Sequence, residues 1–398
     1  MKKICFVVAT PFTANVFLME HLAALSGLYE ISLVANFDEN KTHEIVNPRI
    51  KLINAPITRK ISLISDLHAL LTLFSIFKAN KFDAVHSVTP KAGLLSMVAA
   101  KIAGVSNRHH TFTGQVWATK SGLSRFILKL LDKITFTSSS FALVDSPSQR
   151  DFLISEKVIK ASDSCVLADG SISGVDTSRF HPNPEMRKKI RNQHDISEDS
   201  FVFLYLGRLN REKGIQELIQ AFSMLKSKKS KFYMMLVGPD EEEIIKRLEH
   251  EISAATSYIV TVGYTKTPEH YMSAADVFCL PSHREGFGTV ILEAAASGIP
   301  AIGSNIYGVS DAISDGITGL LHEKKCHLDL AKKMQQLLDD RSLTKALGNN
   351  ALNRAQNKFS SARVTDAMVR FYKEKIPGEA TQKEEYKITK KQQSKETA

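Results

Sequence analysis

Short apolar segments alternate with longer amphipathic segments along almost the whole chain. Segments of helical periodicity separate many of the apolar ones, for example 17–26, 61–80, 92–103, 121–135 and 147–155. We predict strands at 4–9, 29–35, 50–53, 84–87, 107–111, 141–145, 164–167, 201–207, 233–237, 259–262, 277–280, 300–303 and 319–321. Strands separated by helices pair in parallel sheets with helices on both faces. The alternation therefore predicts an α/β fold built from doubly wound, Rossmann-like sheets.

The length of 398 residues exceeds the size at which one hydrophobic core usually divides, so we expect two domains. A Gly- and Ser-rich turn contains Gly170 and Gly174, which tolerate positive φ, and this turn is the predicted hinge. We place an N-terminal domain at 1–172, a C-terminal domain at 173–360, a helix at 361–376 and a disordered polar tail at 377–398. Two facing domains leave an interdomain cleft at the C-terminal edges of their sheets, where ligands of such sheets bind.

The formal net charge of +10 suits nucleic acid, an anionic membrane or a phosphorylated substrate. The sequence carries no nucleic-acid motif, so we expect no nucleic-acid partner and favour a membrane or a pyrophosphate. The four cysteines are scattered, which indicates reduced thiols in a cytoplasmic protein. No apolar run is long enough for a transmembrane helix.

The segment from Glu285 to Glu293 carries the clearest chemical signal, because it sets two carboxylates eight positions apart around a Gly-rich loop. N–H groups of Phe287, Gly288 and Thr289, at the start of a helix, would form a phosphate cradle. The two carboxylates would accept hydrogen bonds from sugar hydroxyls, so the segment predicts a sugar-nucleotide site. An acidic helix start alone would explain Glu285, but it would not explain Glu293 or the paired glycines.

A second basic motif follows the predicted strand that ends at Gly207. Arg208 offers a planar fork for a diphosphate and Lys213 a mobile point charge. Together they would neutralise a leaving nucleoside diphosphate. The alternative is a solvated basic turn with no ligand.

In this order and spacing, the two motifs resemble those of the family 4 retaining glycosyltransferases, which have the GT-B fold, and specifically the bacterial O-antigen and capsular polysaccharide type. The resemblance implies that Arg208 and Lys213 bind the donor pyrophosphate and that Glu285 lies near the donor sugar. It also implies that Glu293 accepts from the ribose hydroxyls and that the region of Gly263 and Tyr264 holds the nucleobase.

The N-terminal half resembles the family less closely. The segment 82–93 is similar to one in bacterial polysaccharide glycosyltransferases, which implies that His86 and Lys91 face the cleft, although His86 could equally be a core residue. Many members of the family carry the pattern H-T-x-H here, with the second His as the catalytic group. In that frame His110 matches the first His and Thr113 occupies the catalytic position, so either His110 or Thr113 is the candidate catalytic residue. The first loop lacks the family's Gly-Gly pair, which leaves Thr13 and Asn15 as its polar candidates.

The resemblance implies transfer, with retention, of a sugar from a nucleoside-diphosphate sugar, UDP-linked in our prediction, to a hydroxyl of an undecaprenyl-diphosphate-linked saccharide. Helix 361–376 would return to the N-terminal domain. The absence of an Asp-x-Asp motif predicts that no metal or other cofactor is needed. We also considered a sugar-nucleotide epimerase on the same fold and a degenerate, non-catalytic partner subunit.

Helix 121–135 has one apolar stripe and one basic stripe, the latter formed by Arg125, Lys129 and Lys133. The basic stripe would suit peripheral contact with anionic lipid at the inner face of the cytoplasmic membrane. The same pattern would also suit a helix that buries its apolar stripe and exposes a solvated basic face.

Overall fold

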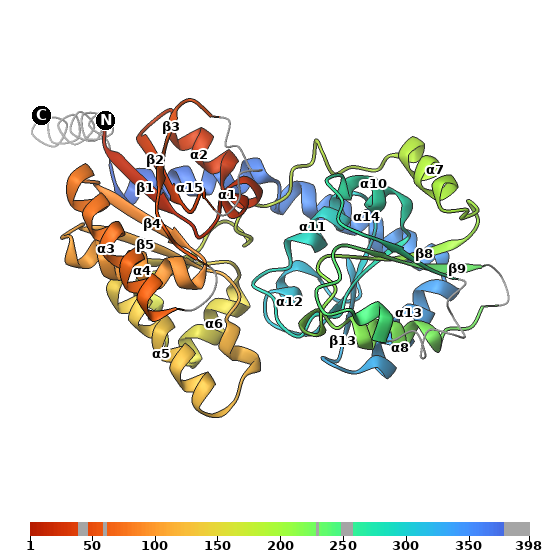
Figure 1. The fold of residues 1–398 in the computed structure, drawn as a ribbon. Helices are drawn as coiled ribbons and strands as arrows, with labels where there is room; N and C mark the ends of the chain where they lie inside the picture. The colour runs from red at the N-terminus through yellow and green to blue at the C-terminus, as the bar shows by residue number, and fades with distance from the viewer. Residues whose placement is uncertain (39–46, 59–61, 228–230, 248–257, 378–398) are drawn as a thin grey trace, which may run out of the picture.

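In the computed structural model the chain forms two parallel β-sheets, each covered by helices on both faces, and the two sheets lie in separate halves of an elongated molecule (Figure 1). The structure describes residues 1–38, 47–58, 62–227, 231–247 and 258–377. Every strand pairing is parallel, as the alternation of strands and helices predicts.

The first sheet has seven strands in the order β3-β2-β1-β4-β5-β6-β7. Its strands are β1 Lys3–Val7, β2 Glu30–Ala35, β3 Ile50–Asn54, β4 Ala84–Val88, β5 Asn107–Phe112, β6 Phe141–Val144 and β7 Ser164–Val166. Its helices are α1 Pro11–Phe17, α2 Met19–Leu25, α3 Leu63–Asn80, α4 Pro90–Ile102, η1 Val116–Thr119, α5 Gly122–Ser138, α6 Pro147–Ser155 and η2 Ala161–Asp163. Two buried clusters, one on α2 and one on α3 and α4, pack against opposite faces of the sheet.

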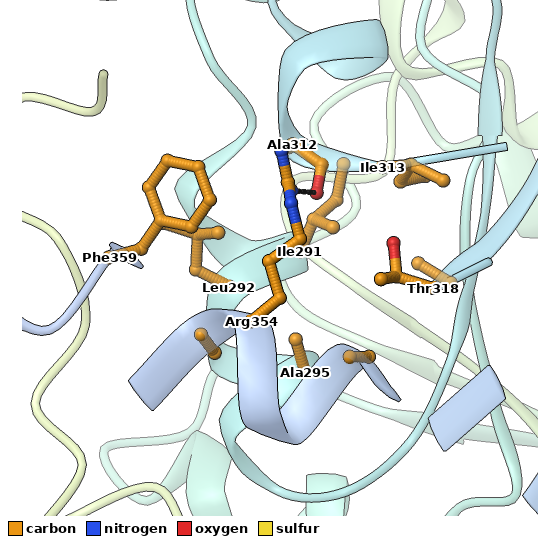
Figure 2. A pocket seen from close by; sticks show the side chains of 11 residues that line it. Ile291, Leu292, Ala295, Ala312, Ile313, Thr318, Arg354 and Phe359 are labelled. Atoms are coloured by element: carbon orange, nitrogen blue, oxygen red, sulfur yellow. Dashed lines mark hydrogen bonds between the residues drawn. The ribbon is translucent and has the colours of Figure 1, made fainter. Parts of the chain in front are cut away.

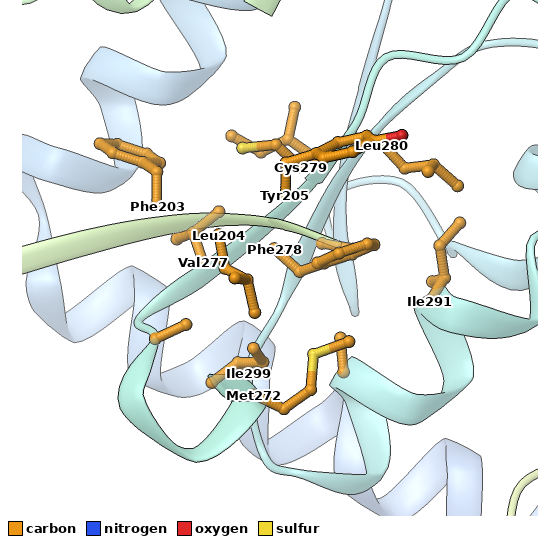
Figure 3. Close-up of a cluster of buried hydrophobic side chains, with 14 of the residues drawn as sticks. Phe203, Leu204, Tyr205, Met272, Val277, Phe278, Cys279, Leu280, Ile291 and Ile299 are labelled. Atoms are coloured by element: carbon orange, nitrogen blue, oxygen red, sulfur yellow. The ribbon is translucent and has the colours of Figure 1, made fainter. Parts of the chain in front are cut away.

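The second sheet has six strands in the order β10-β9-β8-β11-β12-β13. They are β8 Phe201–Leu206, β9 Phe232–Val237, β10 Ile259–Val262, β11 Val277–Leu280, β12 Ala301–Ser304 and β13 Gly319–His322. The helices are α7 Pro184–Gln193, η3 Arg211–Lys213, α8 Ile215–Ser223, α10 Pro268–Ala274, α11 Thr289–Ala296, α12 Val309–Ala312, α13 His327–Asp339 and α14 Arg341–Lys358. Figure 3 shows the core between β8, β11 and the helices, where Phe203, Phe278 and Met272 are completely buried.

In both sheets the strand order reverses beside the first strand, between β1 and β4 and between β8 and β11. Ligands of doubly wound sheets bind at the carboxyl ends of the strands at such a reversal. The predicted motifs at Gly207 and Glu285 follow β8 and β11, so the topology brings them to one edge of the second sheet.

Helix α15 Ser361–Lys375 follows α14 but packs on the first sheet, beside α2 (Figure 1). Met368, Phe371 and Tyr372 join the core on that face. Buried histidines also hold α15: Nδ1 of His21 lies 2.8 Å from Oγ1 of Thr365, and Nδ1 of His86 lies 2.7 Å from Oη of Tyr372. Residues 378–398 of the predicted tail lie outside the described residues.

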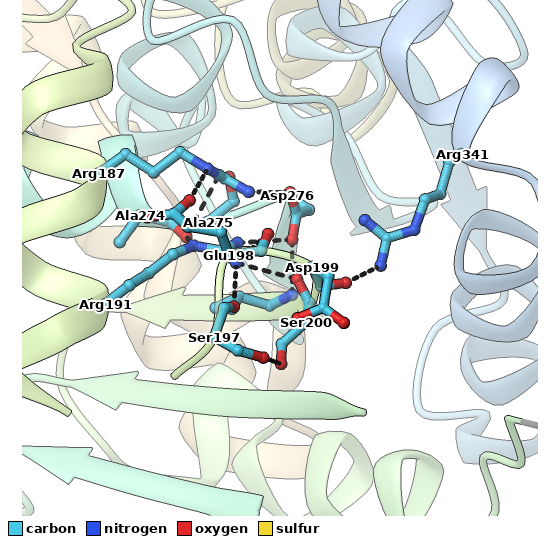
Figure 4. A network of polar contacts seen from close by, with 11 residues as sticks. Arg187, Arg191, Ser197, Glu198, Asp199, Ser200, Ala274, Ala275, Asp276 and Arg341 are labelled. Carbon is cyan, nitrogen blue, oxygen red and sulfur yellow. Dashed lines mark hydrogen bonds and ion pairs between the residues drawn. The ribbon is translucent and has the colours of Figure 1, made fainter. Parts of the chain in front are cut away.

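A buried arginine joins α7 to the start of the second sheet (Figure 4). Arg191 is completely buried, pairs with Asp276 at 2.9 Å and donates to the backbone carbonyls of four residues: Ala274, Ser197, Glu198 and Ser200. Arg187 pairs with the other carboxylate oxygen of Asp276 at 2.7 Å. The network fixes the segment that leads into β8, and therefore the position of the Gly207 turn.

One predicted element is wrong. The first loop, 10–15, is largely helical as α1, and the helix predicted at 17–26 divides at Leu18 into the end of α1 and all of α2. Pro11 occupies the first turn of α1, where its missing N–H costs no hydrogen bond and its fixed φ favours a helix start.

Candidate active site

A cleft of about 940 Å³ separates the two halves, and residues from both line it. Asn15 on α1 lies on the N-terminal side, and Tyr264, Thr289 and Glu293 lie on the C-terminal side. The cleft therefore brings together four residues from three separate sequence motifs. Tyr264 is 64% exposed and follows β10, so its ring is free to stack on a planar group.

Lys213 and Glu285 form an ion pair, with 2.5 Å between Nζ and Oε1. Lys213 ends the short helix η3, where Oδ1 of Asn210 accepts a hydrogen bond from its N–H at 3.1 Å. Glu285 lies in the loop between β11 and α11. Both side chains are only partly exposed, so their charges are weakly screened and neutralise each other.

The loop from Glu285 to Thr289 presents backbone donors at the start of α11. Gly288 is the N-cap with φ of 78°, a conformation that favours glycine. Among the residues that the structure describes, none accepts a hydrogen bond from the N–H of Phe287, Gly288 or Thr289. The Phe287 side chain itself is buried and packs on Phe359, with 5.4 Å between ring centroids. Phe287 can therefore contribute only its backbone to a ligand.

Glu293 lies one turn further along α11, is half-buried and lines the cleft. Burial raises the pKa of its carboxyl group to about 7, a shift that Arg179 opposes and Glu269 reinforces. Within the described part of the chain, no side chain or backbone group donates a hydrogen bond to this carboxylate. A desolvated carboxylate without a donor is well suited to accept hydroxyl groups of a ligand.

Arg208 follows Gly207 at the end of β8 and is largely exposed. Its guanidinium pairs with Glu241 at 3.0 Å, and Asn210 donates to the same carboxylate at 3.0 Å. Exposed pairs of this kind contribute about 0–1 kcal/mol. Arg208 can therefore change partner for an incoming phosphate at little cost.

Of the N-terminal candidates, Thr113 lies at the domain contact, whereas His110 does not reach the cleft. Thr113 is half-buried and precedes Gly114, whose backbone lies against Glu285 and Gly286. His110 is buried, its Nδ1 lies 2.9 Å from Oγ of Ser87, and burial lowers its pKa to about 3. Because the His110 ring fills the space beside Gly93, in the core, Thr113 is the better placed of the two.

The expectation that His86 faces the cleft is wrong. Its two ring nitrogens each lie 2.7 Å from a hydroxyl, Tyr372 Oη and Thr111 Oγ1, inside the core. Lys91 near the start of α4 pairs with Asp66 on α3 at 2.5 Å. Thr13 is also buried, against Thr10, which leaves Asn15 as the polar side chain that α1 directs into the cleft.

Arg179 and Asp176 were not among the predicted site residues, although both line the cleft together with Glu293. They belong to the linker that follows the predicted hinge. Nε of Arg179 donates to Glu269 at 2.9 Å. A charged Asp-Thr-Ser-Arg segment directly after a Gly-rich turn was the available signal.

A small pocket behind the site shows how α12 is supported (Figure 2). Arg354 on α14 donates to the carbonyls of Ala312 and Asp311 at 2.6 and 2.8 Å, and its guanidinium lies 4.8 Å from the ring centroid of Phe359. The pocket has too little free volume for a ligand, at about 10 Å³. Its role is structural, because it holds α12 against the N-terminal domain.

The orientation of helix α5 differs from both sequence-based alternatives, which were membrane contact through its basic stripe and burial of its apolar stripe. Arg125 and Lys129 pair with Glu156 at 2.6 and 2.5 Å and lie over the ring of Trp117, so they are not a free basic stripe. The apolar stripe instead faces outward, with Leu123 73% and Phe126 64% exposed. No helix in the described ranges has both the length and the hydropathy to cross a membrane.

Comparisons with known proteins agree with this architecture. The family model "Glycosyl transferases group 1" matches residues 186–354, and the model "Glycosyl transferase 4-like" matches residues 3–140. The capsular polysaccharide biosynthesis glycosyltransferase CapM of Staphylococcus aureus is 33% identical over 319 residues, which are 80% of this chain and 83% of that protein.

A second relative is the UDP-Gal:alpha-D-GlcNAc-diphosphoundecaprenol alpha-1,3-galactosyltransferase of Escherichia coli, which is 26% identical over 321 residues, or 79% of this chain and 81% of the relative. The crystal structure of Anabaena Alr3699/HepE in complex with UDP superposes with a TM-score of 0.77 at 18% identity. It covers 94% of this chain and 100% of that structure. At this identity the superposition establishes a shared fold.

Proposed function

The chain belongs to the family 4 glycosyltransferases with the GT-B fold, and from that premise we propose that it transfers a sugar, with retention of configuration, from a UDP-sugar to a lipid-linked saccharide. The acceptor in this proposal is a hydroxyl of a saccharide on undecaprenyl diphosphate, as in capsule or O-antigen synthesis. The name of the E. coli relative supports this choice of donor and acceptor, and the name of the S. aureus relative supports a role in capsule synthesis.

One observation carries the proposal. The Lys213–Glu285 pair joins the segments that follow β8 and β11, and the chain continues from Glu285 through the unoccupied N–H groups of Phe287, Gly288 and Thr289 into α11, which carries Glu293 on the wall of the cleft. A donor diphosphate would compete with Glu285 for Lys213 and recruit Arg208 from Glu241. The released Glu285 carboxylate could then accept from a sugar hydroxyl, while Glu293 accepts from the ribose.

In the proposed reaction the bond between the anomeric carbon and the phosphate oxygen breaks, and the acceptor oxygen bonds to the same face of that carbon. The acceptor proton passes to the departing phosphate oxygen. Lys213, Arg208 and the N–H groups of the α11 start would stabilise the negative charge that develops on the diphosphate. We propose no metal for this step, because these cations and N–H groups can balance the charge.

We propose further that the exposed apolar stripe of α5 contacts a membrane surface. A lipid-linked acceptor would place the enzyme at a bilayer, and Leu123, Phe126 and Ile127 could insert below the headgroups. The net charge of +10 would favour an anionic surface. This differs from contact through the basic stripe, since Arg125 and Lys129 are engaged by Glu156.

The decisive experiment incubates the purified chain with a panel of nucleoside-diphosphate sugars and a short-chain lipid diphosphate saccharide, with and without EDTA. We expect one UDP-sugar to be consumed, a product whose anomeric configuration by NMR matches that of the donor, and no loss of activity in EDTA. Inversion would contradict retention, and loss restored by a divalent ion would contradict the metal-free step. Binding of UDP without turnover would support a non-catalytic partner subunit instead.

A further inference from the structure

Away from the cleft opening, the two domains touch along a contact that we call the α6 seam, formed by Gly114, Asp145 and Ser148 with Gly286 and Asp311. The N–H of Ser148, in the first turn of α6, donates to the Asp311 carboxylate at 3.0 Å, and its hydroxyl donates to the same oxygen. The backbones of Gly114 and Gly286 lie so close that a Cβ at Gly286 would be 2.7 Å from the Gly114 nitrogen.

Asp145 lies inside this seam, directly after β6, and its carboxyl group is buried without a hydrogen-bond partner for Oδ1 among the described residues. Oδ2 faces the second domain, because a Cβ at Gly286 would lie 2.8 Å from it. The Asp145 backbone is fixed on both sides: its N–H donates to Phe112 at 3.3 Å, and its carbonyl accepts from Ser171 at 2.7 Å. These two hydrogen bonds hold the Asp145 backbone, and with it the buried carboxyl group, at the seam.

The charged groups on the surrounding elements are engaged elsewhere. Three of them form ion pairs: Glu285 with Lys213, Arg284 with Glu212, and Asp169 with Arg363 and Lys358. Asp311 accepts from Ser148, and Arg150 donates to the carbonyls of Ser164 and Ala161. His110 is neutral. None of them forms a contact with the Asp145 carboxyl group that would compensate its charge. Burial, as the sole cause, raises its pKa to about 8.

We propose that Asp145 is a positioning residue that holds a proton while the α6 seam is closed and releases it when the domains separate, so that closure takes up one proton from solvent. An ionised carboxylate in the closed seam would lose its hydration without gaining a partner, whereas the neutral acid tolerates burial. Because Gly286 adjoins Glu285, closure of the seam also sets the position of Glu285. That last point rests on the proposed function, whereas the protonation of Asp145 does not.

The direction of the pH effect follows from the raised pKa. Below about pH 8 Asp145 is protonated and the seam is stable; above it, ionisation favours separation by about tenfold per pH unit. The substitution Asp145→Asn keeps the shape of the neutral acid and cannot ionise. We expect it to keep the seam closed at every pH at which the chain stays folded.

The test is small-angle scattering of the full chain without ligand between pH 6 and 9.5. We expect the wild-type radius of gyration to increase above pH 8 and that of Asp145→Asn to stay constant. Asp151→Asn, which removes an exposed acid on the neighbouring helix α6, should follow the wild type. A wild-type radius that does not change, or an Asp145→Asn protein that expands like the wild type, would overturn the proposal.

Two further measurements keep the test conclusive. If Asp145→Asn does not fold, carboxyl-¹³C NMR of wild-type protein should show one aspartate that titrates near pH 8, and its absence would also overturn the proposal. In turnover assays wild-type kcat should fall about tenfold per pH unit above 8, with Asp145→Asn unaffected. If scattering behaves as expected but no sugar is transferred, the proposed function fails and the proton-coupled seam stands.

Discussion

Nζ of Lys213 lies 2.5 Å from Oε1 of Glu285, so the two groups that the sequence placed in separate motifs neutralise each other in the ligand-free protein. The contact joins η3, which follows β8, to the loop between β11 and α11. When a diphosphate ligand binds, its two phosphate groups would replace the Glu285 carboxylate as partners of the Lys213 ammonium. In the proposed function, capture of the diphosphate would therefore release Glu285 for the sugar.

The first prediction concerns this pair. Lys213→Met should lower kcat about 10²- to 10³-fold, because it removes one donor to the charge that develops on the leaving group. Glu285→Ala should also lower kcat, and the double variant should lose less than the product of the single losses, since contacting residues are coupled. Steady-state kinetics measure these effects. Arg211→Ala, an exposed cation on the same short helix, is the control and should stay near wild type. Fully additive losses would show that the pair does not act as a unit.

The second prediction concerns pH and Glu293. Because its pKa is about 7 in the free protein, the carboxylate that would accept ribose hydroxyls is lost as the pH falls below 7. We expect the Kd for UDP to rise by up to about tenfold per pH unit below 7. Stability should change in the opposite direction: a raised carboxyl pKa stabilises the folded chain at low pH, and this contribution disappears as the pH rises through 7. Calorimetric titration from pH 5.5 to 8.5 measures Kd.

The matched variant for this measurement is Glu293→Gln, which cannot ionise. Its affinity for UDP should be weaker than that of wild type at pH 8, and below pH 7 it should fall less steeply, only as the terminal phosphate of UDP takes up a proton. A wild-type affinity that does not change between pH 5.5 and 8.5 would contradict a role for the Glu293 carboxylate in ribose binding.

The parallel fold and the second-domain motifs could be predicted from the sequence because they depend on local patterns. Hydrophobic periodicity set the strands, and a Gly-rich loop after β11 placed Glu285 at a sheet edge. Helix α1 was missed because its polar start resembles a loop, even though Pro11 favours a helix start. The strands, the Gly-rich loop and the start of α1 are each determined by a few neighbouring residues.

The remaining errors depend on contacts between distant residues. An amphipathic pattern shows that α5 has two faces, but only Glu156 and Trp117 determine that the basic face turns inward. His86 and His110 resemble site histidines in sequence, yet Tyr372 and Ser87 hold them in the core. Asp145 was missed because an acid before Ser-Pro resembles a helix cap, whereas Ser146 is the cap.

The third prediction concerns stability. Arg191→Met should lower the free energy of unfolding by about 3–5 kcal/mol, because it leaves several buried carbonyls without their donor and removes one of the two arginine partners of Asp276. Urea denaturation followed by circular dichroism measures the change. Arg341→Ala is the control: that side chain is exposed, donates to the Asp199 carbonyl and should cost less than about 1 kcal/mol. Equal losses for the two variants would contradict a special role for the buried network.

The fourth prediction tests the apolar stripe of α5. Leu123→Ser and Phe126→Ser remove two exposed apolar side chains, and each should weaken binding to phosphatidylglycerol vesicles about tenfold, since immersing one such side chain contributes roughly 1.5 kcal/mol or more. Vesicle co-sedimentation measures the binding. Ile317→Ser, which removes an exposed apolar side chain from the second domain, should leave binding unchanged.

The same assay separates apolar from electrostatic docking. Raising the salt concentration should weaken binding only in part, and Lys129→Ala should weaken it less than either α5 variant, because that ammonium is paired with Glu156, which Arg125 shares. If both α5 variants bind vesicles like wild type, the stripe is not the membrane contact. If they instead abolish a dimer detected by light scattering, a second copy of the chain covers α5, because the exposed leucine and phenylalanine would then be buried between protomers.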